Sequence, residues 1–302
     1  MVFKNKHGEL RSGWMLALLM LSYFALSIII GGIAGTILLI TGNFSDIEAV
    51  SDYLTFSPVF NTIIYPTQIS VALLLFWLVY KRPLKQVGFY KADWIKQLLL
   101  GALFGIVFIS FQVLILSTTG MGRMVSFEWG ALTSGLFWSG ILFFLYVGFF
   151  EEILFRGVMM TALKTTRNKW IIILVSSAIF GLVHSLNPNV TVFSVANLIL
   201  AGAVFAYLFI RTGRLWAPIG LHITWNSFMG NIYGIRVSGL TLTSIGDYEF
   251  TGPAWFTGGE FGLEGGLLCT ITMVLALLFI HFGMKQAEGF WGIDTDMPLT
   301  RG

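Results

Sequence analysis

Residues 146–156 read Tyr-Val-Gly-Phe-Phe-Glu-Glu-Ile-Leu-Phe-Arg, and two adjacent glutamates, Glu151 and Glu152, interrupt an apolar run there. The 22 residues before them, from Trp129 to Phe150, carry no charge. A charge-free apolar run of this length is typical of a helix that crosses a membrane. Ionisable groups inside such a helix are energetically costly and are found mainly at functional sites. The stretch therefore predicts a membrane fold with a functional site inside it.

The composition of the whole chain is that of a membrane protein. Of its 302 residues, 56% are hydrophobic and 11% are charged, and the mean hydropathy is +0.82. These values lie outside the range of soluble globular proteins. The apolar segments are long and continuous, whereas the strands of a membrane barrel are short and alternate in polarity. We therefore predict an all-α, polytopic membrane helical bundle that has the lipid bilayer as a partner.

The basic residues and the single cysteine exclude several other classes of protein. The net charge is +3 and the pI is about 9.0, but the cations form short clusters between apolar runs. Such clusters are typical topology signals, so we predict no nucleic-acid partner. One cysteine, Cys269, allows neither an internal disulfide nor a cysteine-based metal site.

Charge-free windows of about 20 residues predict eight transmembrane helices. These windows are 14–40, 58–80, 97–119, 131–163, 170–187, 192–210, 215–231 and 265–284. Lysine and arginine gather in the connections on one side, while Arg123 and Arg236 fall on the other and Arg156 lies inside a span. By the positive-inside rule, both termini are then cytoplasmic.

Further polar residues lie in the apolar spans that follow the acidic pair. His184 lies in the fifth span, and His222 and Asn226 lie one helical turn apart on the same face of the seventh. At a rise of 1.5 Å per residue, these side chains and Glu151 lie ~12 to ~22 Å from the nearest cytoplasmic cations. We therefore expect three helices to bring a carboxylate, two imidazoles and an amide to a common depth.

The two glutamates are expected to have different roles. Neighbouring side chains on a helix point about 100° apart, so only one of the two can face the site squarely. Arg156 follows Glu152 by four residues, which is the favourable spacing for an ion pair. We therefore assign Glu152 and Arg156 to support, and we expect Glu151 to act as a base near neutral pH.

These residue types supply the groups that peptide hydrolysis requires. The reaction needs a base for water, a proton donor for the leaving amine and donors for the oxyanion. The sequence contains no H-E-x-x-H and no G-x-S-x-G motif, and its aspartates lie in predicted loops or tails. An alternative from another class stays open: a non-catalytic regulator or proton-coupled transporter that uses the same buried polar residues.

Three motifs resemble those of a known family, the CAAX prenyl protease and bacteriocin-processing (CPBP) family, which includes the type II CAAX prenyl endopeptidases. The motifs are Glu151-Glu152-xxx-Arg156, Phe180-xxx-His184 and His222-xxx-Asn226. The flanking residues 182–189 and 211–222 are also similar to bacterial members. The resemblance covers roughly residues 140 to 240, about a third of the chain.

The resemblance implies an eight-helix intramembrane endopeptidase in a bacterial plasma membrane. Glu151 and His184 would activate a water, and His222 and Asn226 would stabilise the oxyanion. The substrate would be a peptide or a membrane-anchored protein, since related proteins cut prenylated C-termini or are linked to peptide maturation and bacteriocin self-immunity.

The residues leave two options for a cofactor. Glu151, His184 and His222 could form a zinc site with an open fourth position. However, Asn226 beside His222 is better placed to donate to an oxyanion than to complete a metal shell. We therefore favour a site without a cofactor, with zinc as the alternative.

The chain is interpreted as one integral membrane domain, residues 1–302. Its N-terminal helices span 14–119, a catalytic core covers about 131–240, and the final helix spans 265–284. A Gly-rich external loop, 234–266, connects the last two parts and carries several acidic residues. Its length fits either a lid over a cavity or, as we prefer, an ordinary surface loop.

Overall fold

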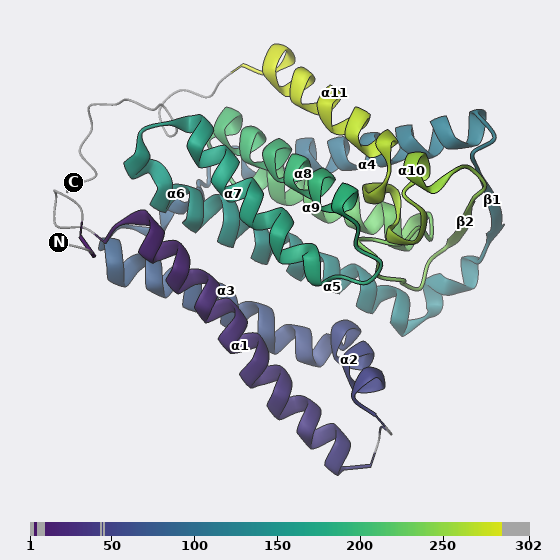
Figure 1. The fold of residues 1–302 in the computed structure, drawn as a ribbon, viewed down its shortest axis with the longest axis horizontal. Helices are drawn as coiled ribbons and strands as arrows, with labels where there is room; N and C mark the ends of the chain where they lie inside the picture. The colour runs from purple at the N-terminus through teal and green to yellow at the C-terminus, as the bar shows by residue number, and fades with distance from the viewer. Residues whose placement is uncertain (1–2, 5–9, 43, 45, 286–302) are drawn as a thin grey trace.

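The computed structural model describes residues 3–4, 10–42, 44 and 46–285, which form a mostly helical bundle (Figure 1). Its α-helices are α1 (Ser12–Ile40), α2 (Ile47–Phe56), α3 (Pro58–Tyr80), α4 (Trp94–Thr118), α5 (Gly135–Glu151), α6 (Met160–Leu163), α7 (Lys169–Val183), α8 (Val192–Thr212), α9 (Trp216–Ser227), α10 (Ala254–Thr257) and α11 (Leu267–Gly283). Two π-helical segments, Glu152–Met159 and Phe228–Ile232, continue α5 and α9. The strands β1 (Gly122–Phe127) and β2 (Gly246–Phe250) pair in antiparallel fashion.

Five of the described helical segments are long and apolar enough to cross a membrane. They are α1, α3, α4, the run Lys169–Leu186 that contains α7, and α8. The prediction of an all-α, polytopic membrane bundle is therefore confirmed, although the strand pair is an addition to it.

The remaining predicted spans coincide with interrupted or shorter helices. The span 131–163 corresponds to α5, the π-helical segment after it and α6, while 215–231 corresponds to α9 with its π-helical end and 265–284 to α11. The total of eight spans, the cytoplasmic termini and the division of the chain into parts stay predictions. Both chain ends lie outside the described residues.

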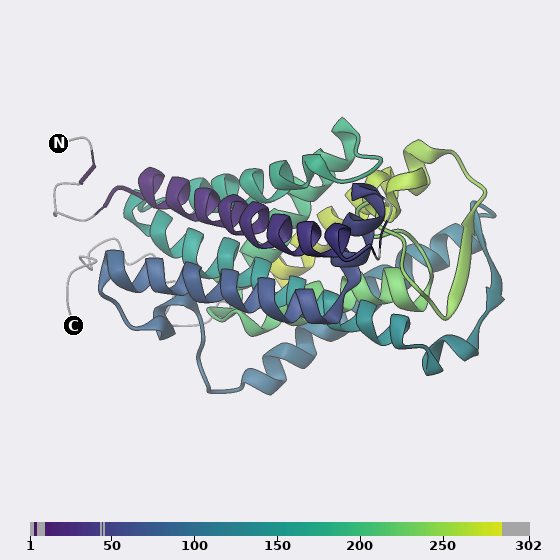
Figure 2. The same cartoon turned by 90° about the horizontal axis from the view of Figure 1, so that it is seen from below.

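The helices form layers around a central group. In Figures 1 and 2, α1 and α3 lie on one side of α5, α7, α8 and α9, while α11 lies on the other side of α8. The β1–β2 pair caps one end of the long axis. The central group contains most of the core, which includes Phe144, Phe180 and Phe209. The motif residues Glu152, Arg156, His222 and Asn226 are accordingly buried in this central group.

The contact between α4 and α9 depends on glycines. A Cβ atom on Gly101 would lie 1.8 Å from the carbonyl oxygen of Ala217, and one on Gly220 would lie 2.1 Å from that of Leu98. Only glycine permits this approach, and small residues at helix crossings are typical of membrane proteins. Because α9 carries His222 and Asn226, this close contact fixes the position of half of the predicted site.

The connection between α1 and α3 contains a helix that its charges do not predict. Asp46 accepts a hydrogen bond from the backbone N–H of Ala49 at 2.9 Å and so caps α2. Ser57 accepts one from Phe60 and caps α3 in the same way. The acidic residues of this connection are therefore part of a capped helix rather than a loop.

The Gly-rich segment 234–266 differs from the expected surface loop, because much of it is packed. Gly258 and Gly262 adopt φ values of +100° and +92°, and a Cβ on either would lie 1.8 Å from a backbone carbonyl oxygen. Only glycine combines these backbone angles with such close contact. Phe261, Leu263 and Glu264 are buried as a result.

Candidate active site

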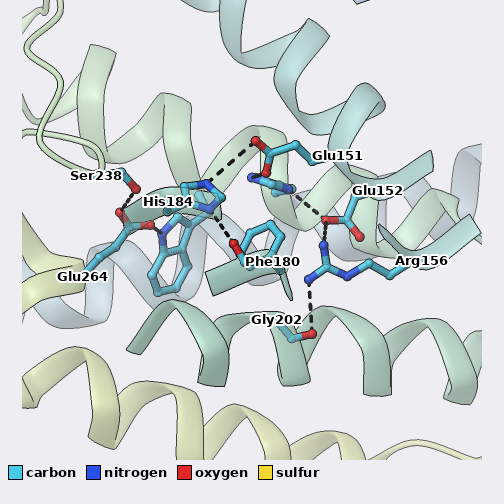
Figure 3. Close-up of polar contacts among 10 residues, drawn as sticks. Glu151, Glu152, Arg156, Phe180, His184, Gly202, Ser238 and Glu264 are labelled. Carbon is cyan, nitrogen blue, oxygen red and sulfur yellow. Dashed lines mark hydrogen bonds and ion pairs between the residues drawn. The ribbon is translucent and has the colours of Figure 1, made fainter. Parts of the chain in front are cut away.

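The acidic pair lies where the helix geometry changes. Glu151 is the last residue of α5, and Glu152 begins the π-helical segment Glu152–Met159. Short π-helical segments inside α-helices are frequent at functional sites, because the wider turn redirects side chains. Both carboxylates contact His222, but Glu151 also faces His184 whereas Glu152 faces Arg156 (Figure 3).

Glu151 faces both histidines of the motifs. Its Oε1 lies 3.8 Å from Nε2 of His184, and its Oε2 lies 3.8 Å from Nε2 of His222. The Oε2 atom is buried and has no hydrogen-bond partner among the described residues. Three residues from separate helices therefore meet at one point, as the sequence predicts, with space for a small molecule between them.

The other ring nitrogen of each histidine is fixed by an acceptor. His184 Nδ1 lies 2.7 Å from the carbonyl oxygen of Phe180, which can only accept, so Nδ1 carries the proton. His222 Nδ1 lies 2.9 Å from Oε1 of Glu152 and donates to it. These bonds orient both rings and direct both Nε2 atoms toward Glu151.

Glu152 and Arg156 form the ion pair that their spacing predicts. Arg156 Nη1 lies 3.0 Å from Oε1 of Glu152, and both side chains are 0% exposed. Arg156 Nη2 also donates to the carbonyl oxygen of Gly202 at 3.2 Å, and the guanidinium lies 4.3 Å from the ring centroid of Phe180. The pair is thus held against α8, which carries Gly202, and α7, which carries Phe180.

The contact between Glu152 and His222 adds a function that sequence reasoning missed. The sequence assigned Glu152 mainly to the pair with Arg156, because a helical spacing reveals partners only within one helix. In the structure, one oxygen of Glu152 accepts from both Arg156 and His222. The supporting pair is therefore connected directly to the proposed oxyanion histidine.

Asn226 lines the same cavity as Glu151, His184 and His222. The residue is 6% exposed, and within the described part of the chain its side-chain amide makes no hydrogen bond. A buried amide of this kind is available to a ligand. The structure thus brings Glu151, His184, His222 and Asn226 together, with Glu152 and Arg156 directly behind them.

The cavity has a volume of about 190 Å³ and is walled mainly by apolar side chains. Aromatic residues from α1, α3 and α5, including Tyr23, Tyr65 and Phe143, form one wall. Ser238 and Glu264 from the Gly-rich segment form part of another. The sequence analysis did not identify Ser238 or Glu264 as site residues, since neither belongs to a periodic pattern. The many glycines around Glu264 were the one sequence signal that this segment is tightly packed.

Comparisons with known proteins point to one family. Residues 133–228 match the family model described as "Type II CAAX prenyl endopeptidase Rce1-like". The chain is 37% identical over 79 residues to the Bacillus subtilis (strain 168) protein named "Putative membrane peptidase YdiL", covering 26% of this chain and 30% of the relative. It is 30% identical over 104 residues to "Uncharacterized protein YyaK" of the same organism, covering 31% and 35%.

The matched regions are partial. The chain spans about a third of the length of these curated relatives. No solved structure matches the chain. The family match nevertheless contains all seven named residues of the motifs, from Glu151 to Asn226, whereas Glu264 lies outside it. Residues 133–228 of this integral, multi-pass membrane protein are therefore similar to the Rce1-like type II CAAX prenyl endopeptidases.

Proposed function

We propose that the protein is an intramembrane endopeptidase that hydrolyses a peptide bond of a membrane-associated peptide or protein. The observation that carries this proposal is the position of Glu151. Its carboxylate lies 3.8 Å from Nε2 of each motif histidine, in a cavity that Asn226 also lines. The family of the matched segment consists of endopeptidases by its description, which supports the same reaction.

A water molecule fits between Glu151 and His184. Two acceptors that are 3.8 Å apart can each accept one hydrogen of a water that lies about 2.8 Å from both. The lone pair of that water then points at the substrate carbonyl. As the new C–O bond forms, Glu151 takes a proton from the water, and it delivers a proton to the leaving amine when the C–N bond breaks.

His222 and Asn226 supply the donors for the oxyanion. The Asn226 amide is a neutral donor, whereas His222 donates through Nε2 only when its ring is an imidazolium, since Nδ1 already donates to Glu152. The carboxylates of Glu151 and Glu152 lie 3.8 and 2.9 Å from the two ring nitrogens of His222 and would stabilise a positive charge on this ring during the reaction.

Glu152 and Arg156 are positioning residues in this mechanism. They touch neither the water nor the proposed oxyanion, but Glu152 holds the ring of His222 in its orientation. Donors that are fixed before the reaction stabilise developing charge without reorganisation.

A zinc ion would be held by Glu151, His184 and His222, with the free Nε2 atoms as ligands, and it would supply a water of lowered pKa. Ligands at about 2.1 Å in a tetrahedron are about 3.4 Å apart. The separations between Glu151 and the two Nε2 atoms are wider, at 3.8 Å. We therefore propose that the site works without a metal.

The arrangement of the polar residues also bears on the non-catalytic alternative. A proton relay requires ionisable groups in a line across the membrane. Glu151, His184, His222 and Asn226 instead line one cavity. This cluster supports the hydrolase over the transporter.

The experiment that tests the proposal uses purified protein in lipid nanodiscs after removal of metals with a chelator. The substrate is a mixture of synthetic single-span peptides, and the products are identified by mass spectrometry. We expect internal peptide bonds to be cleaved at an unchanged rate after chelation, because the base and the donors are side chains. Activity that is lost on chelation and restored by zinc would contradict the metal-free mechanism, and no cleavage at all would contradict the proposed function.

A further inference from the structure

A third buried carboxylate, Glu264, lines the cavity on another wall. Figure 3 shows Glu264 and Ser238 on one side of His184 and Glu151 on the other. Glu264 is 5% exposed, and its carboxylate accepts two hydrogen bonds, from Trp225 Nε1 at 3.1 Å and from Ser238 Oγ at 2.5 Å. The proposed mechanism has no role for this residue.

The backbone of Glu264 is held as firmly as its side chain. Asn197 on α8 donates through Nδ2 to the carbonyl oxygens of Glu264 and Gly266, at 2.8 and 2.9 Å. The Oδ1 atom of Asn197 accepts from Thr270 on α11 at 2.6 Å. The Gly-rich segment thus places one acidic side chain at the cavity on a backbone that hydrogen bonds to α8 hold in position.

Ser238 is held in an unusual conformation beside Glu264. Its φ is +49°, which is uncommon for a residue other than glycine and often marks a functional position. Asn187 donates through Nδ2 to its carbonyl oxygen at 3.1 Å. On either side of Ser238, the apolar residues Val237 and Leu240 also line the cavity.

The charge of Glu264 has no counterpart within the described residues. Both of its donors are neutral, and no lysine, arginine or histidine of the described chain forms an ion pair with it. Glu152, in contrast, contacts both Arg156 and His222. A buried carboxylate without a cation is unfavourable, so a cation that enters the cavity would be bound strongly there.

We propose that Glu264 determines specificity by binding a lysine or arginine side chain of the peptide that is cleaved. The proposal rests on the endopeptidase function proposed above. The carboxylate receives the ammonium or guanidinium group, and Leu198, Val237 and Leu240 contact its aliphatic stem. Because Glu264 and Glu151 line one cavity, the basic residue lies at a fixed number of residues from the bond that is cut.

The first test compares cleavage of matched peptides by the wild-type protein and by Glu264→Gln. The peptides differ only in having lysine, arginine, glutamine or norleucine at each position near the cleaved bond. We expect the wild type to prefer a basic residue at one position by about tenfold or more in kcat/KM, as for a charge-assisted contact. Glu264→Gln is expected to lose this preference, so that its ratio of kcat/KM for the basic peptide over the neutral one falls to within about threefold of one, because the lost contact favours only the cationic substrates.

Glu260→Gln is the matched control, since it makes the same change in the same segment at an exposed residue. It is expected to keep the wild-type preference. A wild-type protein without any basic preference, or a preference that survives in Glu264→Gln, would overturn the inference while leaving the endopeptidase function intact.

The second test measures cation binding without cleavage. Hexylguanidinium and its neutral isostere hexylurea are added to the protein, and the Tm is recorded. We expect hexylguanidinium to raise the Tm of the wild type and of Glu151→Gln more than hexylurea does, and to have no such advantage in Glu264→Gln. A purely structural role of Glu264 would change the Tm of the variant but leave this difference in place.

Together, the two tests show whether the cation site or the endopeptidase function is at fault when an expected result is absent. Cation binding that requires Glu264, without cleavage of any peptide, would support the cation site and contradict the endopeptidase function. Equal responses of the wild type and Glu264→Gln to hexylguanidinium would overturn the cation site whatever the cleavage result.

Discussion

Glu151→Gln is expected to lower the cleavage rate by about 10³-fold or more while the protein remains folded. Glutamine has the shape of glutamate but cannot take a proton from water, and general acid–base catalysis contributes about 10²- to 10⁴-fold. The fold should be retained, because the carboxylate of Glu151 lies no closer than 3.8 Å to the ring nitrogens of His184 and His222 and its side chain is 16% exposed. The measurements are kcat/KM for a cleaved peptide and the Tm of the purified variant.

The control for this prediction is Glu128→Gln, at an exposed residue just after β1. Its kcat/KM and its Tm should equal those of the wild type. A Glu151→Gln protein that cleaves at the wild-type rate would remove Glu151 from the mechanism. A variant that simply unfolds would indicate that the acidic pair only holds the helices together.

Glu152→Gln is expected to lower stability and activity together. The change leaves the fully buried guanidinium of Arg156 without its counter-charge and weakens the bond that orients His222. Removal of one partner of a buried ion pair costs about 3–5 kcal/mol of the free energy of unfolding. Chemical denaturation of the purified protein measures this cost, and kcat/KM measures the loss of activity in the fraction that remains folded.

A double variant separates the two effects of Glu152. Glu152→Leu with Arg156→Met removes both charges, and an apolar replacement of a buried ion pair is often neutral for stability. We expect the double variant to regain stability but to remain poorly active, because Nδ1 of His222 loses its acceptor. Full activity in either protein would contradict the positioning role of Glu152.

The sequence alone predicts the parts of the structure that depend on local patterns. Long apolar runs indicate helices wherever the backbone must satisfy its own hydrogen bonds in lipid, and the windows 14–40 and 58–80 coincide closely with α1 and α3. The spacing of four likewise predicts the pair of Glu152 and Arg156, which the structure contains.

The rest depends on contacts between distant residues. The hydrogen bond between Glu152 and His222 joins positions 70 residues apart, and no periodic pattern in the sequence predicts it. Glu264 is similar: its buried position follows from glycine packing and from hydrogen bonds to Trp225 and Ser238, while its local sequence has the composition of a surface loop. The sequence did not predict α2, because helix-capping residues and solvated loop residues are of the same polar types.

The central claim is that water held by Glu151 and His184 attacks the peptide carbonyl directly. A single turnover in oxygen-18 water tests it, with excess protein and mass analysis of both the released fragment and the protein. We predict one oxygen-18 atom in the new carboxyl group of the fragment and none in Glu151. An unlabelled fragment together with oxygen-18 in Glu151 would contradict the claim, because the carboxylate would then have attacked the substrate itself.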